Sequence, residues 1–170
     1  MLLRCVRAGL MVSHGVRTDT IVYLCLLGGP GAPRTLRFDG ATARFLRPDE
    51  RSLATLAQKT LAADVATGPG FVPVRHGVSV ARGGLDAVLG DLDGATPYVL
   101  EEGAPDIRDA KMAEASLALF LGDHLGFTEE SRAALAAHGA VALGLGPVSM
   151  HAEDAVTVVS NELDRRARPA

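Results

Sequence analysis

Short apolar runs alternate with helical patterns along the second half of the chain. Residues 98–100, 117–121 and 140–145 are short apolar runs typical of strands, whereas residues 128–138 and 152–166 carry apolar side chains at helical spacing. Strands that alternate with helices form a parallel sheet covered by helices. The pattern therefore predicts an α/β fold with a mostly parallel sheet flanked by helices.

The first half of the chain is less regular. Residues 2–14 have an irregular helical spacing of apolar side chains, which predicts a helix that ends before a glycine. Residues 21–27 form a continuous apolar run, typical of a strand buried on both faces of a parallel sheet. Residues 35–38 and 43–46 flank Asp39-Gly40, a dipeptide that favours tight turns, and they predict an antiparallel hairpin appended to the sheet.

The middle of the chain predicts one longer helix and two short elements. The helix begins at Pro48-Asp49-Glu50, because proline and acidic residues suit the first turn of a helix, and it ends near Asp64. Gly68-Pro69-Gly70 indicates a loop. Residues 78–80 predict a short strand, and residues 85–92 predict a helix after a pair of glycines.

The composition is typical of a globular protein. Of the 170 residues, 48% are hydrophobic and 22% are charged. There is no internal repeat and no long polar linker, so residues 1–170 are expected to form a single domain. No apolar run approaches the roughly 20 residues that a membrane helix needs, and the N-terminal run lacks the features of a signal peptide. We therefore expect a cytoplasmic protein without membrane segments.

The sequence lacks the motifs of several common classes of enzyme. Glycine motifs for dinucleotides and nucleoside triphosphates are absent, as are His-x-x-x-His and Gly-x-Ser-x-Gly. Cys5 and Cys25 have no cysteine or histidine at metal-binding spacing, so we expect buried free thiols and no metal site. The net charge of -3 indicates that any nucleic-acid site must be a local patch.

Glycine-bearing or acidic turns follow three of the predicted strands. They are Leu100 to Gly103, Leu121 to Gly126 and Leu145 to Met150. In open α/β sheets, ligands bind beyond the carboxyl ends of neighbouring strands, where glycines let the backbone approach closely. We interpret the three turns together as a cofactor site, while each turn alone is also explained by ordinary turn residues. His124, within the second turn, either satisfies local carbonyls or contacts the ligand.

Five sequence blocks occur in the order of a known family. They are Ser13–Asp19, Phe45–Ser52, Leu121–Gly126, Leu145–Ala152 and Asn161–Arg165. With these blocks, the chain resembles the archaeal tRNA pseudouridine-N1 methyltransferases and their bacterial relatives, which form a branch of the SPOUT class. Each block alone is short, but together they cover nearly the whole chain.

The resemblance implies a fold, a reaction, a cofactor and partners. It implies a SPOUT fold, in which the C-terminal segment of a parallel α/β sheet forms a deep trefoil knot, and it implies a homodimer. It also implies methyl transfer from S-adenosyl-L-methionine (SAM) to N1 of pseudouridine in tRNA. The cofactor-binding positions that it implies are Leu100, Gly122, Leu145, Gly146, Pro147, Val148, Ser149, Met150 and Ala155.

Two features depart from the family's pattern. The family has a strand and a glycine-containing loop before the Arg4-Cys5 helix, so this chain is expected to be N-terminally short and to lack the first strand. Ala155 stands where archaeal members typically carry a cysteine, which favours a bacterial relative whose RNA substrate can differ. Two alternatives therefore stay open: a catalytically silent dimeric RNA-binding protein, or a methyltransferase for a different acceptor.

The sequence does not identify a catalytic base. Candidates near the expected cofactor are Asp106, Arg108, Asp123 and His151, and each of them also suits a purely structural role.

A cluster of arginines offers a surface for RNA. Arginines that contact phosphates give salt-dependent affinity, but a solvated face balanced by Asp39, Asp49 and Glu50 explains the cluster equally well. Few aromatic residues accompany the cluster, so we expect a folded RNA to be recognised by shape. The arginines are Arg34, Arg37, Arg44, Arg47 and Arg51, with Arg17 nearby in the sequence.

Overall fold

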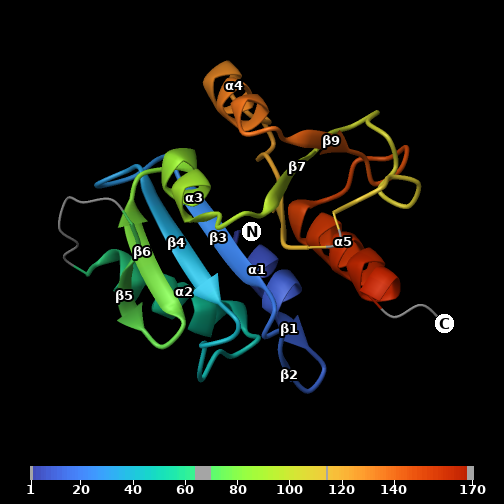
Figure 1. Cartoon of the computed structure of the whole chain (residues 1–170). Coiled ribbons are helices and arrows are strands. Elements are labelled where there is room, and N and C mark those ends of the chain that lie inside the picture. Colours follow the sequence, from blue (N-terminus) through green and yellow to red (C-terminus); the bar gives the residue numbers. More distant parts are fainter. Residues whose placement is uncertain (1, 64–69, 114, 168–170) are drawn as a thin grey trace. The chain divides into compact units, whose positions relative to one another are not determined.

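The computed structural model describes residues 2–63, 70–113 and 115–167. The chain divides into two units, Met1–Asp91 and Leu92–Ala170, and each is described by itself (Figure 1). The first unit contains an antiparallel sheet and the second a parallel sheet. Within the described ranges, no helix is long and apolar enough to cross a membrane.

The main sheet of the first unit has four strands in the order β3-β4-β6-β5, and all neighbouring strands are antiparallel. Helices α1 and α2 pack on one face, where Leu36, Phe38 and Val80 of the sheet meet Val6 and Leu53 of the helices. The strands are β3 (Ile21–Leu26), β4 (Arg34–Asp39), β5 (Val72–Arg75) and β6 (Val78–Arg82), and the helices are α1 (Leu2–Leu10), α2 (Glu50–Leu61) and α3 (Leu85–Asp91).

The helix predicted over residues 2–14 is shorter in the structure, because α1 ends at Leu10. The chain then folds back in a two-stranded hairpin of β1 (Met11–Val12) and β2 (Gly15–Val16). The amide of Arg17 donates to the carbonyl of Leu10 over 2.8 Å and holds the hairpin against the end of the helix. The glycine that was expected to end the helix therefore lies in a strand.

The strand predicted at residues 21–27 forms, but the prediction that it is buried on both faces of a parallel sheet is wrong. It is β3, which pairs antiparallel with β4 along its whole length. Its Ile21 and Cys25 are exposed, so the apolar run does not indicate burial on both faces. Cys5 and Cys25 are free thiols as expected, but neither is fully buried.

The hairpin predicted for residues 35–46 is wrong. Strand β4 pairs with β3 and β6, and residues 43–46 form no strand. Asp39-Gly40 does turn the chain, and Asp39 accepts a 2.9 Å hydrogen bond from the amide of Ala41. A Cβ atom at Gly40 would lie 1.8 Å from the carbonyl oxygen of Arg17, so only glycine fits there. The turn predicted at Asp39-Gly40 is correct, but the strands that pair with β4 are β3 and β6 and not residues 43–46.

Helix α2 begins as predicted. Its N-cap is Asp49, whose carboxylate accepts a 2.8 Å hydrogen bond from the amide of Ser52. The helix ends at Leu61, with Ala62 as its C-cap. Asp64, Gly68 and Pro69, on which the predicted helix end and loop depend, lie outside the described residues. The strand and helix predicted at residues 78–80 and 85–92 are confirmed as β6 and α3.

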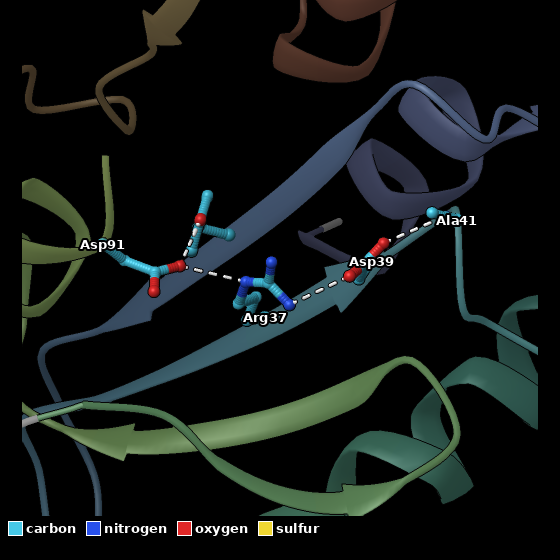
Figure 2. A network of polar contacts seen from close by, with 5 residues as sticks. Arg37, Asp39, Ala41 and Asp91 are labelled. Atoms are coloured by element: carbon cyan, nitrogen blue, oxygen red, sulfur yellow. Dashed lines mark hydrogen bonds and ion pairs between the residues drawn. The ribbon is translucent and has the colours of Figure 1, made fainter. Parts of the chain in front are cut away.

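A polar network joins the last residue of α3 to strands β3 and β4 (Figure 2). The carboxylate of Asp91 accepts hydrogen bonds from the Tyr23 hydroxyl at 2.6 Å and from Arg37 Nε at 3.0 Å. Arg37 also pairs with Asp39 at 3.2 Å. Burial, followed by the hydrogen bond to Asp91, raises the pKa of Tyr23 to about 12. Arg37 is therefore part of the internal structure of the first unit.

The second unit is built on a parallel sheet in the order β8-β7-β9. Tyr98, Leu143 and Val159 form its core with Ile107. The strands are β7 (Thr96–Leu100), β8 (Leu117–Phe120) and β9 (Val141–Leu143), and the helices are α4 (Glu129–Ala137) and α5 (Ala152–Ala167). All five elements predicted for this half are confirmed. The predicted mostly parallel sheet is thus correct for the second unit and wrong for the first.

Phe38→Ala tests the core of the first unit. Phe38 is fully buried, and its truncation is expected to lower the free energy of unfolding by about 3–5 kcal/mol because it leaves a cavity. Phe45 is 92% exposed, so Phe45→Ala is a matched control with an expected change of about 0.5 kcal/mol or less. Urea unfolding followed by circular dichroism measures both, and equal losses would contradict this assignment of the core.

Candidate active site

The three turns noted in the sequence leave the parallel sheet at one edge. Because β7 pairs parallel with both neighbours, Val99 lies opposite Phe120 and Leu100 lies opposite Leu143. The chain therefore leaves all three strands on the same side, where ligands bind in sheets of this type. We name the turns the β7 bend (residues 101–107), the β8 bend (residues 121–126) and the β9 bend (residues 144–150).

The β7 and β9 bends are joined by their backbones. The amide of Glu101 donates to the carbonyl of Leu143 over 2.9 Å, and the amide of Gly144 donates to Pro105 over 2.8 Å. The amide of Ile107 in turn donates to Gly144 over 2.8 Å. A Cβ atom on Gly144 would lie 2.4 Å from the carbonyl oxygen of Ala104. Glycine at position 144 is therefore needed for the two bends to touch.

Two adjacent glutamates connect the β7 bend to helix α4 and to the β9 bend. Glu101 forms an ion pair with Arg132 of α4, the helix that follows the β8 bend. Glu102 accepts a hydrogen bond from the hydroxyl of Ser149 in the β9 bend. The acidic turn is visible in the sequence but these partners are not, because Arg132 and Ser149 come from segments distant in the sequence. The β7 bend is thus fixed to the β9 bend and to the helix that follows the β8 bend.

The β8 bend is a tight turn closed by its own backbone. Asp123 accepts a 2.8 Å hydrogen bond from the amide of Leu125, and its carbonyl accepts from Gly126 at 3.0 Å. A Cβ atom on Gly122 would lie 2.9 Å from the Cα of Gly126, so the two glycines pack backbone against backbone. Asp123 therefore stabilises the turn, while His124 is exposed.

The β9 bend offers free backbone groups. Among the described residues, the carbonyls of residues 145–150 and the amides of the same residues other than Pro147, which has no N–H, form no backbone hydrogen bond. Gly146 has a φ of 113°, and its side-chain position faces open space. Val148 is 74% exposed and Met150 is 39% exposed, whereas Ala155, in the first turn of α5, is buried. Unpaired amides and carbonyls next to apolar side chains suit an adenine and a ribose.

The family is decided by comparison with known proteins. The family model for SAM-dependent RNA methyltransferases matches residues 1–168. The chain belongs to this family.

Individual relatives agree with the family match. The tRNA (pseudouridine(54)-N(1))-methyltransferase of Methanosarcina acetivorans is 39% identical over 165 residues, which cover 97% of this chain and 77% of the relative. The enzyme of that name from Methanopyrus kandleri is 36% identical over 160 residues, covering 94% and 76%. The crystal structure of Archaeoglobus fulgidus Nep1 bound to S-adenosylhomocysteine has a TM-score of 0.65 and 18% identity, and the match covers 97% and 69%. The last similarity shows a shared fold.

Two of the candidate catalytic residues of this methyltransferase family member have structural roles. Asp106 forms a two-pronged ion pair with Arg108, whose hydrogen bonds lower the pKa of Asp106 to about 2. A carboxylate with so low a pKa is a weak proton acceptor. Asp123 caps the β8 bend. His151, at the start of α5, has an exposed side chain next to the β9 bend.

The described part of the chain contains no group of three or more His, Cys, Asp or Glu placed to hold a metal ion.

Gly144→Ala tests the contact between the β7 and β9 bends. The added methyl group would overlap the carbonyl of Ala104, so we expect the free energy of unfolding of the second unit to fall by about 1–3 kcal/mol. Gly90→Ala, in α3, is the control, because its side-chain position is open and alanine favours a helix. Thermal unfolding measures both. A loss that is no larger at position 144 than at position 90 would disprove the contact.

Asp106→Asn tests the ion pair with Arg108 by its pH dependence. The pKa of Asp106 is lowered in the folded chain from its ordinary 3.8 to about 2, so the unfolded chain binds the proton first as the pH falls. The resulting stability is present above about pH 4 and is lost towards pH 2. Urea unfolding across this range should give a steeper loss for the wild type than for the variant, and identical slopes would contradict the assignment.

Proposed function

We propose that this protein transfers a methyl group from SAM to N1 of a pseudouridine in tRNA. The observation that carries the proposal is the similarity of nearly the whole chain to enzymes of that name, at 39% identity in the Methanosarcina acetivorans relative. The Nep1 neighbour, which has the same fold, was crystallised with S-adenosylhomocysteine. We assign the cofactor to the edge of the parallel sheet at which the three bends follow strands β7, β8 and β9.

The cofactor site of the proposal consists of the positions implied by the sequence. Free backbone groups of the β9 bend would bind the polar edges of adenine and ribose, while Val148 and Met150 would cover the apolar faces. Leu100, Gly122 and Ala155 complete the site. When bound, SAM supplies an electrophilic methyl group on a positively charged sulfur. Glu102, which accepts from the neutral hydroxyl of Ser149, places negative charge at the same edge, and this charge would complement that sulfur.

In this reaction, the protein chiefly aligns the acceptor nitrogen with the methyl carbon of SAM. Methyl transfer from a sulfonium is an in-line displacement, so the nitrogen and the methyl carbon must be held in position. Bends that are tied to one another by backbone hydrogen bonds and by Glu101 and Glu102 provide a fixed frame for that purpose. The N1 proton of pseudouridine must leave, and the low pKa of Asp106 argues against that carboxylate as its acceptor.

The proposal also covers the domain organisation, the oligomeric state and the localisation of the protein. We assign both units to one methyltransferase domain, which the family match over residues 1–168 supports. We further assign a trefoil knot to the C-terminal segment and a homodimer to the active form. Val141 and Val158 of the second unit are exposed apolar side chains that a second copy would cover. We also assign the protein to the cytoplasm, because its proposed substrate is tRNA.

Calorimetry with SAM tests the cofactor site, and two glycines provide a matched pair of variants. Gly146 and Gly139 both have a positive φ and an open side-chain position, although the φ of 113° at Gly146 is less favourable for alanine than the φ of 77° at Gly139, so the unfolding of both variants is recorded beside SAM binding. Gly146 lies in the β9 bend, whereas Gly139 precedes β9 at the opposite edge of the sheet. We expect Gly146→Ala to weaken SAM binding about tenfold or more and Gly139→Ala to leave it unchanged. Equal effects of the two variants would contradict the site.

Nucleoside analysis tests the reaction. The purified protein is incubated with SAM and with tRNA transcripts that do or do not contain pseudouridine, and the nucleosides are identified by mass spectrometry. The proposal predicts N1-methylpseudouridine only from the first transcript. A methyl group on another nucleoside would favour a different acceptor, and undetectable SAM binding by the wild type would favour a silent RNA-binding protein.

A further inference from the structure

The structure separates the arginine cluster of the sequence into two groups. Arg37 belongs to the network with Asp39 and Asp91, and the guanidinium of Arg34 donates to the carbonyl of Leu61. These two arginines stabilise the first unit. Arg44, Arg47 and Arg51, by contrast, line a groove in the same unit. Only the second group is available to a ligand.

The groove has a volume of about 850 Å³ and is strongly basic. Arg75, the last residue of β5, and His76, which follows it, join Arg44, Arg47 and Arg51 in lining the groove, and all five residues are exposed. No Asp or Glu of the described residues lines the groove. Arginine stays charged at every physiological pH, so four positive charges face one concave surface.

The nearby acidic residues have other roles. Asp49 caps α2 by accepting from the amide of Ser52, although its pKa also responds to the charge of Arg47. Glu50 forms an ion pair with Arg4 at 3.2 Å. Arg44, Arg51 and Arg75 form no ion pair with any residue that the structure describes. The positive charge of the groove is therefore largely uncompensated within the unit.

One backbone contact builds the groove from two distant segments. Gly77 has a φ of 72°, and a Cβ atom there would lie 2.3 Å from the Cα of Ala43. The amide of Asp39 also donates to the carbonyl of Gly77 over 2.8 Å. These contacts bring Arg75 and His76 next to Arg44. The arginines distant in the sequence thus form one surface, which the spacing of residues could not indicate.

Phe45 stands out among the residues that line the groove. It is 92% exposed and has a φ of 60°, which makes it the non-glycine residue with positive φ among the described residues. A backbone conformation that costs free energy, combined with an exposed aromatic ring, serves no purpose in the core of this unit. An aromatic ring on a basic surface is the usual platform for stacking an unpaired base.

We propose that this groove binds the tRNA substrate, with the arginines on consecutive phosphates and Phe45 stacked on an unpaired base. The proposal rests on the proposed function in so far as tRNA is the substrate. The sequence led us to expect that a folded RNA is recognised by its shape, and this proposal adds stacking of an unpaired base on Phe45. A small anion does not match the geometry, because charges spread along an exposed groove of this size suit a polyanion that spans them.

Salt-dependent binding tests the arginines. The affinity of the full chain for a pseudouridine-containing tRNA transcript is measured by fluorescence anisotropy at several salt concentrations, without SAM. For the double variant Arg51→Gln/Arg75→Gln, we expect affinity to fall about tenfold or more and the slope of log affinity against log salt to shrink by about two. Lys59→Gln removes a positive charge from the same helix outside the groove, and it should change neither quantity.

Phe45 is tested by a pair of substitutions. Phe45→Leu keeps an apolar side chain but removes the aromatic face, and we expect tRNA affinity to fall about tenfold. Phe45→Tyr keeps the face and should retain wild-type affinity, with the salt dependence unchanged in both variants. A variant that lost binding through misfolding would also lose its circular dichroism spectrum, so the spectrum is recorded for each protein.

The outcomes separate this proposal from the proposed function. If the groove variants bind tRNA like the wild type, or if Lys59→Gln weakens binding as much as they do, the groove is not the RNA site. That result leaves SAM binding and methyl transfer untouched. Conversely, if the wild type fails to bind SAM but the groove variants still lose tRNA affinity, the proposed function falls and the groove proposal stands.

Discussion

The parallel pairing of β7 with both β8 and β9 is the constraint on which the candidate active site depends. That register places Leu100 opposite Leu143 and Val99 opposite Phe120, so three chain segments leave the sheet at one edge. Backbone hydrogen bonds around Gly144 then join two of the bends, Glu102 accepts from Ser149 of the β9 bend, and Glu101 pairs with Arg132 of α4, the helix that follows the β8 bend. A cofactor that contacts all three bends needs this fixed arrangement, because each bend alone is only a turn.

The second unit could be predicted from the sequence because its signals are local. Short apolar runs and helical spacing between residues 98 and 166 gave the correct elements, and alternation of strands with helices implied parallel pairing. The first unit could not be predicted in the same way. Strand β4 pairs with β6 across some forty intervening residues, and nothing in either strand indicates that partner. The turn at Asp39-Gly40 therefore suggested a hairpin with the wrong segment.

In both candidate sites, the features carried by residue type could be predicted from the sequence, and the contacts between distant segments could not. Glycines and exposed apolar residues of the β8 and β9 bends could be named in advance because turn chemistry is visible in the residue types. The partners of Glu101 and Glu102 could not, since Arg132 and Ser149 meet them only in the folded chain. In the groove, three arginines were visible as a cluster. Arg75 and His76 were not, because the contact between Gly77 and Ala43 brings them there.

The central claim is that the methyl donor binds at the three bends of the second unit. Amide hydrogen exchange of the protein with and without saturating SAM locates that site without any substitution. We predict that SAM slows exchange in the β7, β8 and β9 bends together, most of all at residues 145, 146 and 148–150, whose amides have no backbone partner among the described residues. Protection confined to the first unit, or to one bend alone, would contradict it.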